Sequence, residues 1–88
     1  MGKIKFYMVV IEDYDGEGFA RLDIKHFRTK MEAEKHFNAE LSQFKEDVPD
    51  YNDDEQYYVE EESTSFYWYP HGEYSTNHFR AYIEEIEI

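Results

Sequence analysis

One stretch of the chain, residues 29–46, has the periodicity of an α-helix, and the other patterned stretches resemble β-strands. Thr29 followed by Glu32 matches a capping box, in which two side chains satisfy backbone donors at the start of a helix. Pro49 ends the stretch. The remaining helix positions are polar, so we expect one apolar stripe to pack on a sheet while the opposite side faces water. That stripe consists of Ala33, Phe37, Leu41 and Phe44, and Val48 extends it.

Two strand-like segments precede this helix. Residues 3–12 are apolar at both alternating phases, which predicts a central strand covered at least partly on both sides. Residues 18–27 alternate cleanly, which is typical of a strand whose polar side is solvated. Asp15-Gly16 and Gly18 predict a hairpin connection between the two segments. In the second segment, one face carries Ala20, Leu22 and Ile24, and the other carries Arg21, Asp23 and Lys25.

Three more strand-like segments follow the helix. Pro70 and Gly72 mark a turn between the last two of them. The resulting order, β-β-α-β-β-β, predicts a single α+β domain over residues 1–88, with a mainly antiparallel sheet and the helix packed across one face. The three segments are residues 56–62, 64–70 and 77–88.

The last segment has a break in its apolar pattern. Phe79, Ala81 and Ile83 share one face of a strand, whereas Ile86 falls on the other face. This change of phase predicts a β-bulge or the end of the strand near Glu84-Glu85.

Acidic residues are concentrated in the second half of the chain. Residues 47–62 contain eight acidic side chains and no Lys or Arg, and the net charge of the chain is −12. Residues 1–28, in contrast, balance five basic against five acidic side chains. A field of this sign repels nucleic acid and anionic membranes and attracts basic surfaces on other proteins. We therefore expect a basic protein surface as the partner, and neither nucleic acid nor a membrane.

Several classes of protein are not supported by the sequence. The chain has no cysteine, so it has neither a disulfide framework nor a thiolate zinc site. The apolar run near residue 6 is too short for a signal peptide, and no run approaches the ~20 residues of a membrane span, so a cytoplasmic location is expected. No nucleophile elbow or Gly-rich phosphate loop is present. We expect no enzyme, no catalytic residues and no cofactor.

Two patterns resemble metal sites only weakly. The loop at residues 12–17 contains an Asp-x-Asp-Gly element, but an EF-hand needs helices on both sides, and a hairpin turn explains the element better. His71 and His78 flank the last turn with Glu73 nearby, and a spacing of this kind is poor evidence for a metal site. The sequence therefore predicts no metal ion.

The acidic half also carries most of the aromatic side chains, ten of the seventeen in the chain. Glu60 and Glu62 fall on one face of a strand, ~6.6–6.8 Å apart, a spacing comparable with that of nucleic-acid phosphates. In the run at residues 66–69, Phe66 and Trp68 face one way and two tyrosines face the other, so one pair is expected to be exposed or half-exposed. Tyrosines among carboxylates are typical of protein-binding surfaces. The predicted partner-binding residues are Asp53, Asp54, Glu55, Tyr57, Tyr58, Glu60, Glu61, Glu62, Tyr67 and Tyr69.

Three functional hypotheses are compatible with these features. In size, charge and aromatic content the chain resembles the small acidic inhibitors that phages make against DNA-handling proteins of their hosts, including restriction inhibitors, uracil-DNA glycosylase inhibitors and anti-CRISPR proteins. This resemblance implies a protein inhibitor that mimics nucleic-acid phosphates, and no motif carries family residues over. The alternative is a structural or assembly subunit, a homo-oligomer whose exposed strand edges and aromatic side chains pair with copies of itself. The net charge opposes contact between the acidic parts unless the interface lies on the near-neutral residues 1–46. The third is a small ligand-binding or metal-binding domain, which would need a pocket that 88 residues with a full core leave little room for. For the acidic run itself, the alternative is a solvated face that only keeps a small protein soluble.

Overall fold

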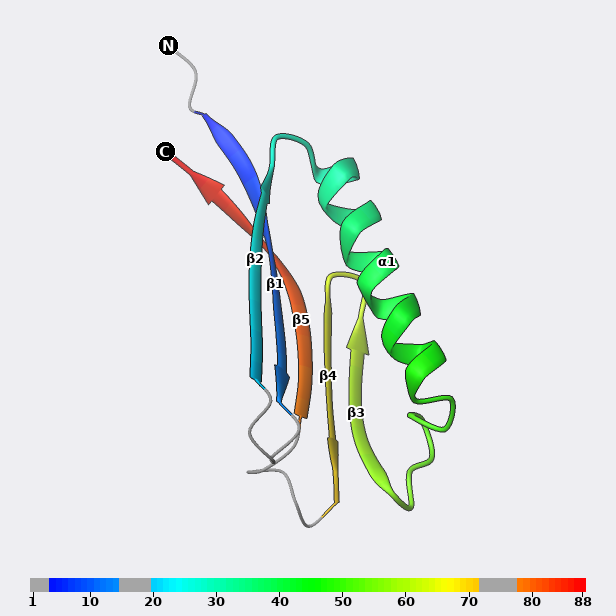
Figure 1. The fold of residues 1–88 in the computed structure, drawn as a ribbon. Helices are drawn as coiled ribbons and strands as arrows, with labels where there is room; N and C mark the ends of the chain where they lie inside the picture. The colour runs from blue at the N-terminus through cyan, green and yellow to red at the C-terminus, as the bar shows by residue number, and fades with distance from the viewer. Residues whose placement is uncertain (1–3, 15–19, 72–77) are drawn as a thin grey trace.

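Five antiparallel strands form one sheet, and a single helix crosses one face of it (Figure 1). The computed structural model describes residues 4–14, 20–71 and 78–88. The strand order is β2-β1-β5-β4-β3, so β2 and β3 are the two edges. This arrangement confirms the predicted α+β class and element order. The elements are β1 (Lys5–Tyr14), β2 (Ala20–Phe27), α1 (Lys30–Asp47), β3 (Tyr57–Glu62), β4 (Ser65–Pro70) and β5 (His78–Glu87).

Both ends of α1 have the predicted local contacts. The Oγ1 atom of Thr29 accepts a hydrogen bond from the backbone N–H of Glu32 at 3.2 Å, and the Thr29 hydroxyl donates to the Glu32 carboxylate at 2.9 Å. At the other end, the N–H of Val48 donates to the carbonyl of Phe44 at 2.9 Å, and Pro49 follows. The N-cap at Thr29 and the proline stop are therefore confirmed, with the Glu32 carboxylate bonded to the Thr29 hydroxyl.

The core lies between α1 and the face of the sheet that it covers. Phe44 stacks on Phe79 with ring centroids 4.3 Å apart and meets Trp68 edge to face at 5.1 Å. Burying each such side chain contributes about 1.5–3 kcal/mol. The buried residues of this cluster are Val9, Ile11, Ala33, Phe37, Leu41, Phe66, Trp68, Phe79 and Ala81.

The strand β1 is central, as predicted, because β2 and β5 pair with it on either side. Val9 and Ile11 face the helix and are fully buried. Val10 points to the other face and is still only 3% exposed. Neighbouring side chains of the sheet therefore cover the middle of β1 on both sides.

The predicted bulge in the last strand is wrong. β5 pairs with β1 without interruption, from Tyr14 opposite His78 to Lys5 opposite Glu87. The residue that broke the apolar pattern, Ile86, pairs with Phe6 on the face away from α1. The change of phase reflects apolar side chains on both faces of a regular strand, since the far end of β5 lies beside the apolar start of β1.

The alternation predicted for β2 is present, but its orientation is reversed. Leu22 and Ile24 point away from α1 and are 67% and 46% exposed. Asp23 pairs with Ile11 of the core and therefore lies on the face that α1 covers. Pairing with β1 sets this register, and α1 only borders the edge strand, so polar side chains fit beside the helix there.

The predicted hairpin at Asp15-Gly16 and Gly18, and Gly72 of the last turn, lie outside the described residues. In the ranges that are described, no helix combines the length and the apolar character that crossing a bilayer requires.

Candidate functional site

The face of the sheet opposite α1, called the open face below, has no helix over it among residues 4–14, 20–71 and 78–88 (Figure 1). Alternate residues of all five strands point to it, and the residues between them point to the core. Its side chains are Phe6, Met8, Val10, Glu12 and Tyr14 of β1; Ala20, Leu22, Ile24 and His26 of β2; Tyr58, Glu60 and Glu62 of β3; Ser65, Tyr67 and Tyr69 of β4; and His78, Arg80, Tyr82, Glu84 and Ile86 of β5.

Three tyrosines form a contiguous cluster on the β3 and β4 part of the open face. The ring of Tyr69 stacks on Tyr58 with centroids 4.8 Å apart and lies 5.3 Å from Tyr67. All three residues are half-buried, whereas Phe66 and Trp68 are buried on the covered face. The predicted division of residues 66–69 between the two faces is therefore confirmed.

The cluster also binds a carboxylate. The hydroxyl of Tyr58 donates a hydrogen bond to the carboxylate of Glu60 at 2.7 Å. This bond to an anion favours the neutral phenol and raises the pKa of Tyr58 above its ordinary value of 10.0. One strand position further along the same face, the carboxylate of Glu62 accepts from the hydroxyl of Ser65 at 3.1 Å.

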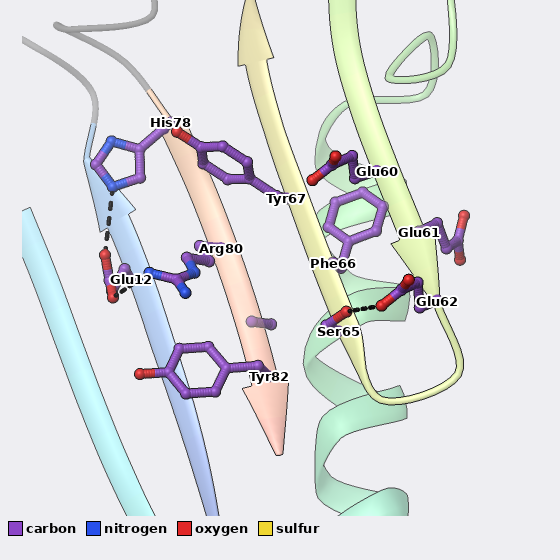
Figure 2. Close-up of a pocket in the computed structure, with 11 residues that line it drawn as sticks. Glu12, Glu60, Glu61, Glu62, Ser65, Phe66, Tyr67, His78, Arg80 and Tyr82 are labelled. Atoms are coloured by element: carbon purple, nitrogen blue, oxygen red, sulfur yellow. Dashed lines mark hydrogen bonds and ion pairs between the residues drawn. The ribbon is translucent and has the colours of Figure 1, made fainter. Parts of the chain in front are cut away.

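A groove of about 630 Å³ runs across the open face (Figure 2). Carboxylates and a tyrosine from β3 and β4 line one side of it, and a mixed set from β1 and β5 lines the other. From the open face, Glu60, Glu62, Ser65 and Tyr67 form the first side, and Glu12, His78, Arg80 and Tyr82 form the second. Glu61, Phe66 and Ala81, which lie on the covered face, complete the lining.

The second side of the groove neutralises its own charge. The carboxylate of Glu12 lies 3.6 Å from Nε2 of His78 and 3.7 Å from a terminal nitrogen of Arg80 (Figure 2). The guanidinium of Arg80 also lies over the ring of Tyr82, 4.7 Å from its centroid. Within the described residues, neither Glu60 nor Glu62 has a basic side chain in ion-pair contact. The first side therefore holds uncompensated negative charge next to tyrosine rings.

Five of the ten predicted partner-binding residues lie together on the open face: Tyr58, Glu60, Glu62, Tyr67 and Tyr69. Two others, Tyr57 and Glu61, lie on the covered face. Tyr57 packs on Trp68 with centroids 4.9 Å apart. Glu61 accepts a hydrogen bond from Nζ of Lys45 at 2.8 Å, and this bond raises the pKa of Lys45. These two side chains make contacts within the fold and do not belong to the open face.

The remaining three predicted residues, Asp53, Asp54 and Glu55, precede β3. The carboxylate of Asp53 accepts from the side chain of Gln56 at 2.8 Å and from the backbone N–H of Glu55 at 3.0 Å. These two bonds favour the ionised form and lower the pKa of Asp53. Asp53 therefore holds a turn, whereas Asp54 and Glu55 are exposed.

Five side chains that line the groove from the open face were not among the predicted ones: Glu12, Ser65, His78, Arg80 and Tyr82. Three of them alternate along β5 with the buried Phe79 and Ala81, so the phase of that strand was a signal that places them on the face away from the core. No comparable local signal brings Glu12 beside them, because β1 and β5 are far apart in the sequence.

No protein-family model, no curated protein and no solved structure matches this chain. The argument for function therefore rests on the geometry of the open face.

Proposed function

We propose that this chain is a small acidic binding protein that docks its open face on a basic surface of a nucleic-acid-handling protein and blocks that surface. The observation that carries the proposal is the uncompensated pair Glu60 and Glu62 beside the ring of Tyr67 in an open groove. Aromatic side chains with a charged surround are the usual composition of a protein-binding surface.

The groove suits the side chain of an arginine or a lysine from the partner. A cation that enters it meets carboxylates that accept charge-assisted hydrogen bonds, which are stronger than neutral ones. Tyr67 offers an aromatic face for a cation–π contact. Because Glu60 and Glu62 are two residues apart on one strand, their backbone positions are ~6.6–6.8 Å apart, a spacing comparable with that of nucleic-acid phosphates.

The charge of the whole chain supports the same partner. A net charge of −12 increases the rate at which a basic protein meets this one, and the effect weakens with salt. In this proposal the distributed acidic residues steer the partner, and the groove on the open face orients it.

A second candidate function is the assembly subunit, and one observation favours it. Leu22 and Ile24 are exposed on the β2 edge of the open face, at the opposite edge of the sheet from the carboxylates of β3. Two copies that pair through this apolar edge would keep their acidic parts apart.

The experiment that tests the proposal is capture from cytosol at low salt on the immobilised chain, with elution by duplex DNA. A nucleic-acid-binding protein released by the DNA supports the proposal, because the DNA then competes for the same basic surface. Recovery of the chain alone, with a concentration-dependent dimer in sedimentation, favours the assembly subunit. Recovery of no protein contradicts both.

Matched variants then identify the docking face. Glu60→Gln with Glu62→Gln removes two charges from the open face, and Glu46→Gln with Glu85→Gln removes two exposed charges from the helix side. We expect the first pair to slow association with the captured protein and to flatten its salt dependence, while the second pair has a much smaller effect. Equal effects would show that net charge alone matters and that the open face is not the docking surface.

A further inference from the structure

His36 has an unpaired polar atom on the covered side of the sheet. Its Nε2 atom is buried and has no hydrogen-bond partner in the described part of the chain. Its ring packs on Phe27 with centroids 5.4 Å apart, which restricts its orientation. Buried polar atoms are rarely left unpaired, and each one that is calls for an explanation.

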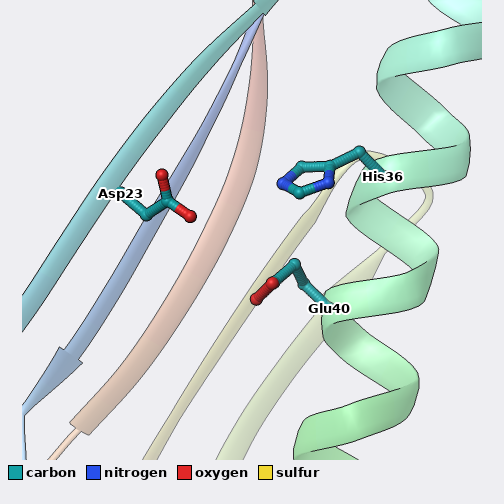
Figure 3. A group of neighbouring side chains, drawn as sticks. All are labelled: Asp23, His36 and Glu40. Carbon is teal, nitrogen blue, oxygen red and sulfur yellow. The ribbon is translucent and has the colours of Figure 1, made fainter.

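Two carboxylates lie beside this ring. Glu40 is one helical turn after His36 on α1, so both side chains project from the same side of the helix. Asp23 projects toward them from the facing side of β2. Figure 3 shows the three side chains converging on one space, with the ring of His36 directed toward Asp23. One donor atom from each lies within 4.8 Å of the other two.

We propose that Asp23, His36 and Glu40 bind a divalent transition-metal ion, with Zn²⁺ as the preferred ion, and that the ion fastens β2 to α1. An imidazole nitrogen with two carboxylate oxygens is a donor set that Zn²⁺ accepts, and three protein ligands leave its fourth position for water. Ligands ~2.0 Å from a tetrahedral ion lie about 3.3 Å apart, so the donors approach each other modestly on binding.

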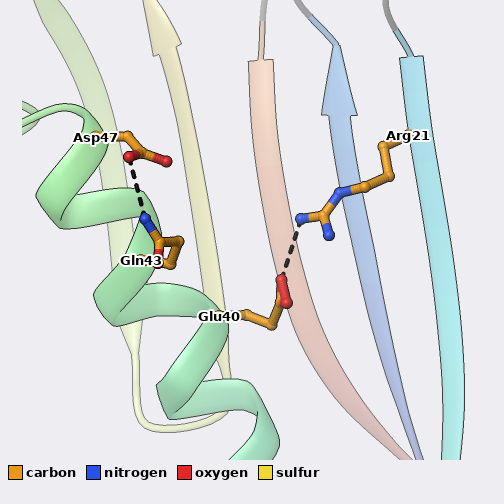
Figure 4. Close-up of polar contacts among 4 residues, drawn as sticks. All are labelled: Arg21, Glu40, Gln43 and Asp47. Carbon is orange, nitrogen blue, oxygen red and sulfur yellow. Dashed lines mark hydrogen bonds and ion pairs between the residues drawn. The ribbon is translucent and has the colours of Figure 1, made fainter.

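A neighbouring residue is placed to support the site. Arg21 donates from its guanidinium to one carboxylate oxygen of Glu40 at 3.1 Å, which leaves the other oxygen for the ion (Figure 4). Ligating carboxylates are commonly held by outer hydrogen bonds of this kind. Asp23, Glu40 and Arg21 carry a combined charge of −1, so the site attracts a cation before it binds.

The reversed orientation of β2 brings Asp23 to this site. The strand leaves Leu22 and Ile24 in water and places Asp23 beside the helix, against its local hydrophobic pattern. Positions where a fold departs from its local pattern are often functional sites. An ion bound by Asp23 would make use of the orientation that pairing with β1 sets.

The test is titration of the untagged protein with Zn²⁺ by calorimetry, in a buffer with excess Mg²⁺. The Mg²⁺ occupies surface carboxylates, because it prefers oxygen ligands. We expect one Zn²⁺ per chain. His36→Gln and Glu40→Gln should each weaken binding at least ~10-fold, the lower bound for loss of an outer-shell partner. The matched control is His26→Gln, an exposed histidine on the other face of β2, which should bind as the wild type does.

A second measurement uses only the wild-type protein, so it does not require that the variants fold. Addition of Zn²⁺ should move the Nε2 resonance of His36 in long-range ¹H–¹⁵N spectra and leave that of His26 in place. Circular dichroism establishes whether each variant is folded. Absence of wild-type binding, an unchanged Nε2 resonance, or equal affinity in folded His36→Gln would overturn the proposal.

Discussion

Between the sheet and α1, Phe37, Phe66 and Phe79 are at most 2% exposed, whereas on the open face Tyr58, Tyr67 and Tyr69 are half-buried. Both sets are aromatic rings, but the three buried residues are phenylalanines and the three on the open face are tyrosines, which carry a hydroxyl. A phenylalanine gains most when water is excluded completely, while a tyrosine keeps a polar end that needs a partner or water. The comparison shows that a sheet can hold its fold on one face and still present aromatic area on the other.

The carboxylates of β3 divide in the same way. On the covered face, Glu61 is paired with Lys45 of the helix. On the open face, Glu60 and Glu62 accept hydrogen bonds from neutral hydroxyls and keep their net charge. Glu61 is therefore neutralised within the fold, whereas Glu60 and Glu62 keep their charge on the open face.

The largest expected difference between the two sides of the sheet is in the free energy of unfolding when an aromatic ring is removed. We expect Phe37→Ala to lower the free energy of unfolding by about 3–5 kcal/mol, because it removes buried area and leaves a cavity. Tyr67→Ala on the open face should cost about 1 kcal/mol, since part of its ring already meets water. Urea unfolding measures both changes. Equal costs would show that the open face is part of the core.

The next effect concerns the ion pair on the covered side. A double-mutant cycle with Lys45→Met and Glu61→Gln should give a coupling of about 0.2–1 kcal/mol, because both side chains reach solvent. The raised pKa of Lys45 sets its pH dependence. Its contribution is complete below the ordinary pKa of 10.5 and is lost as pH rises through the higher pKa of the folded state. A coupling that is unchanged well above that pH would contradict the assignment.

A smaller effect is expected at the exposed apolar edge. Leu22→Gln and Ile24→Gln should each change the free energy of unfolding by no more than about 0.5 kcal/mol, which is usual for surface positions. The measurement is urea unfolding at low protein concentration, so that self-association does not contribute. Losses of about 2 kcal/mol or more would mean that these side chains are buried, as the sequence pattern predicts.

The smallest expected effect is a change in the pKa of one phenol. The phenol of Tyr58 should titrate above pH 10.0, and Glu60→Gln should return its pKa toward that value, because the anionic acceptor is gone. The pKa can be followed through the ring carbon resonance of Tyr58. Tyr67 serves as the internal comparison in the same spectra. A Tyr58 pKa that does not respond to Glu60→Gln would show that the hydrogen bond does not form in solution.

Much of the local structure could be predicted, and the reason lies in short-range contacts. The cap at Thr29 and the stop at Pro49 depend on residues within one turn of the helix. The positions of the strands and the facing of Phe66 and Trp68 follow from the two-residue period of a strand. The change of apolar phase at Ile86 predicted a bulge, and this prediction is wrong. Ile86 pairs with Phe6 on the open face, and Phe6 is 80 positions away in the sequence.

The candidate site was predictable only in part. Alternation alone places Glu60 with Glu62 and separates Glu61 from them. It does not show that Glu61 meets Lys45 of the helix, or that Glu12 lies beside His78 and Arg80. Those contacts depend on strand order and on the position of α1, and several antiparallel orders are compatible with the same five strands.

The sequence by itself determined the helix, the five strands, the two alternating sets of side chains in each strand, and a charge of −12 concentrated after residue 46. Only the tertiary structure decided which set of each strand is covered. In the edge strand β2 the polar set lies on the covered face, because pairing with β1 sets the register and α1 covers only part of that strand. The groove and the cluster of Asp23, His36 and Glu40 both follow from that long-range pairing, which no local pattern encodes.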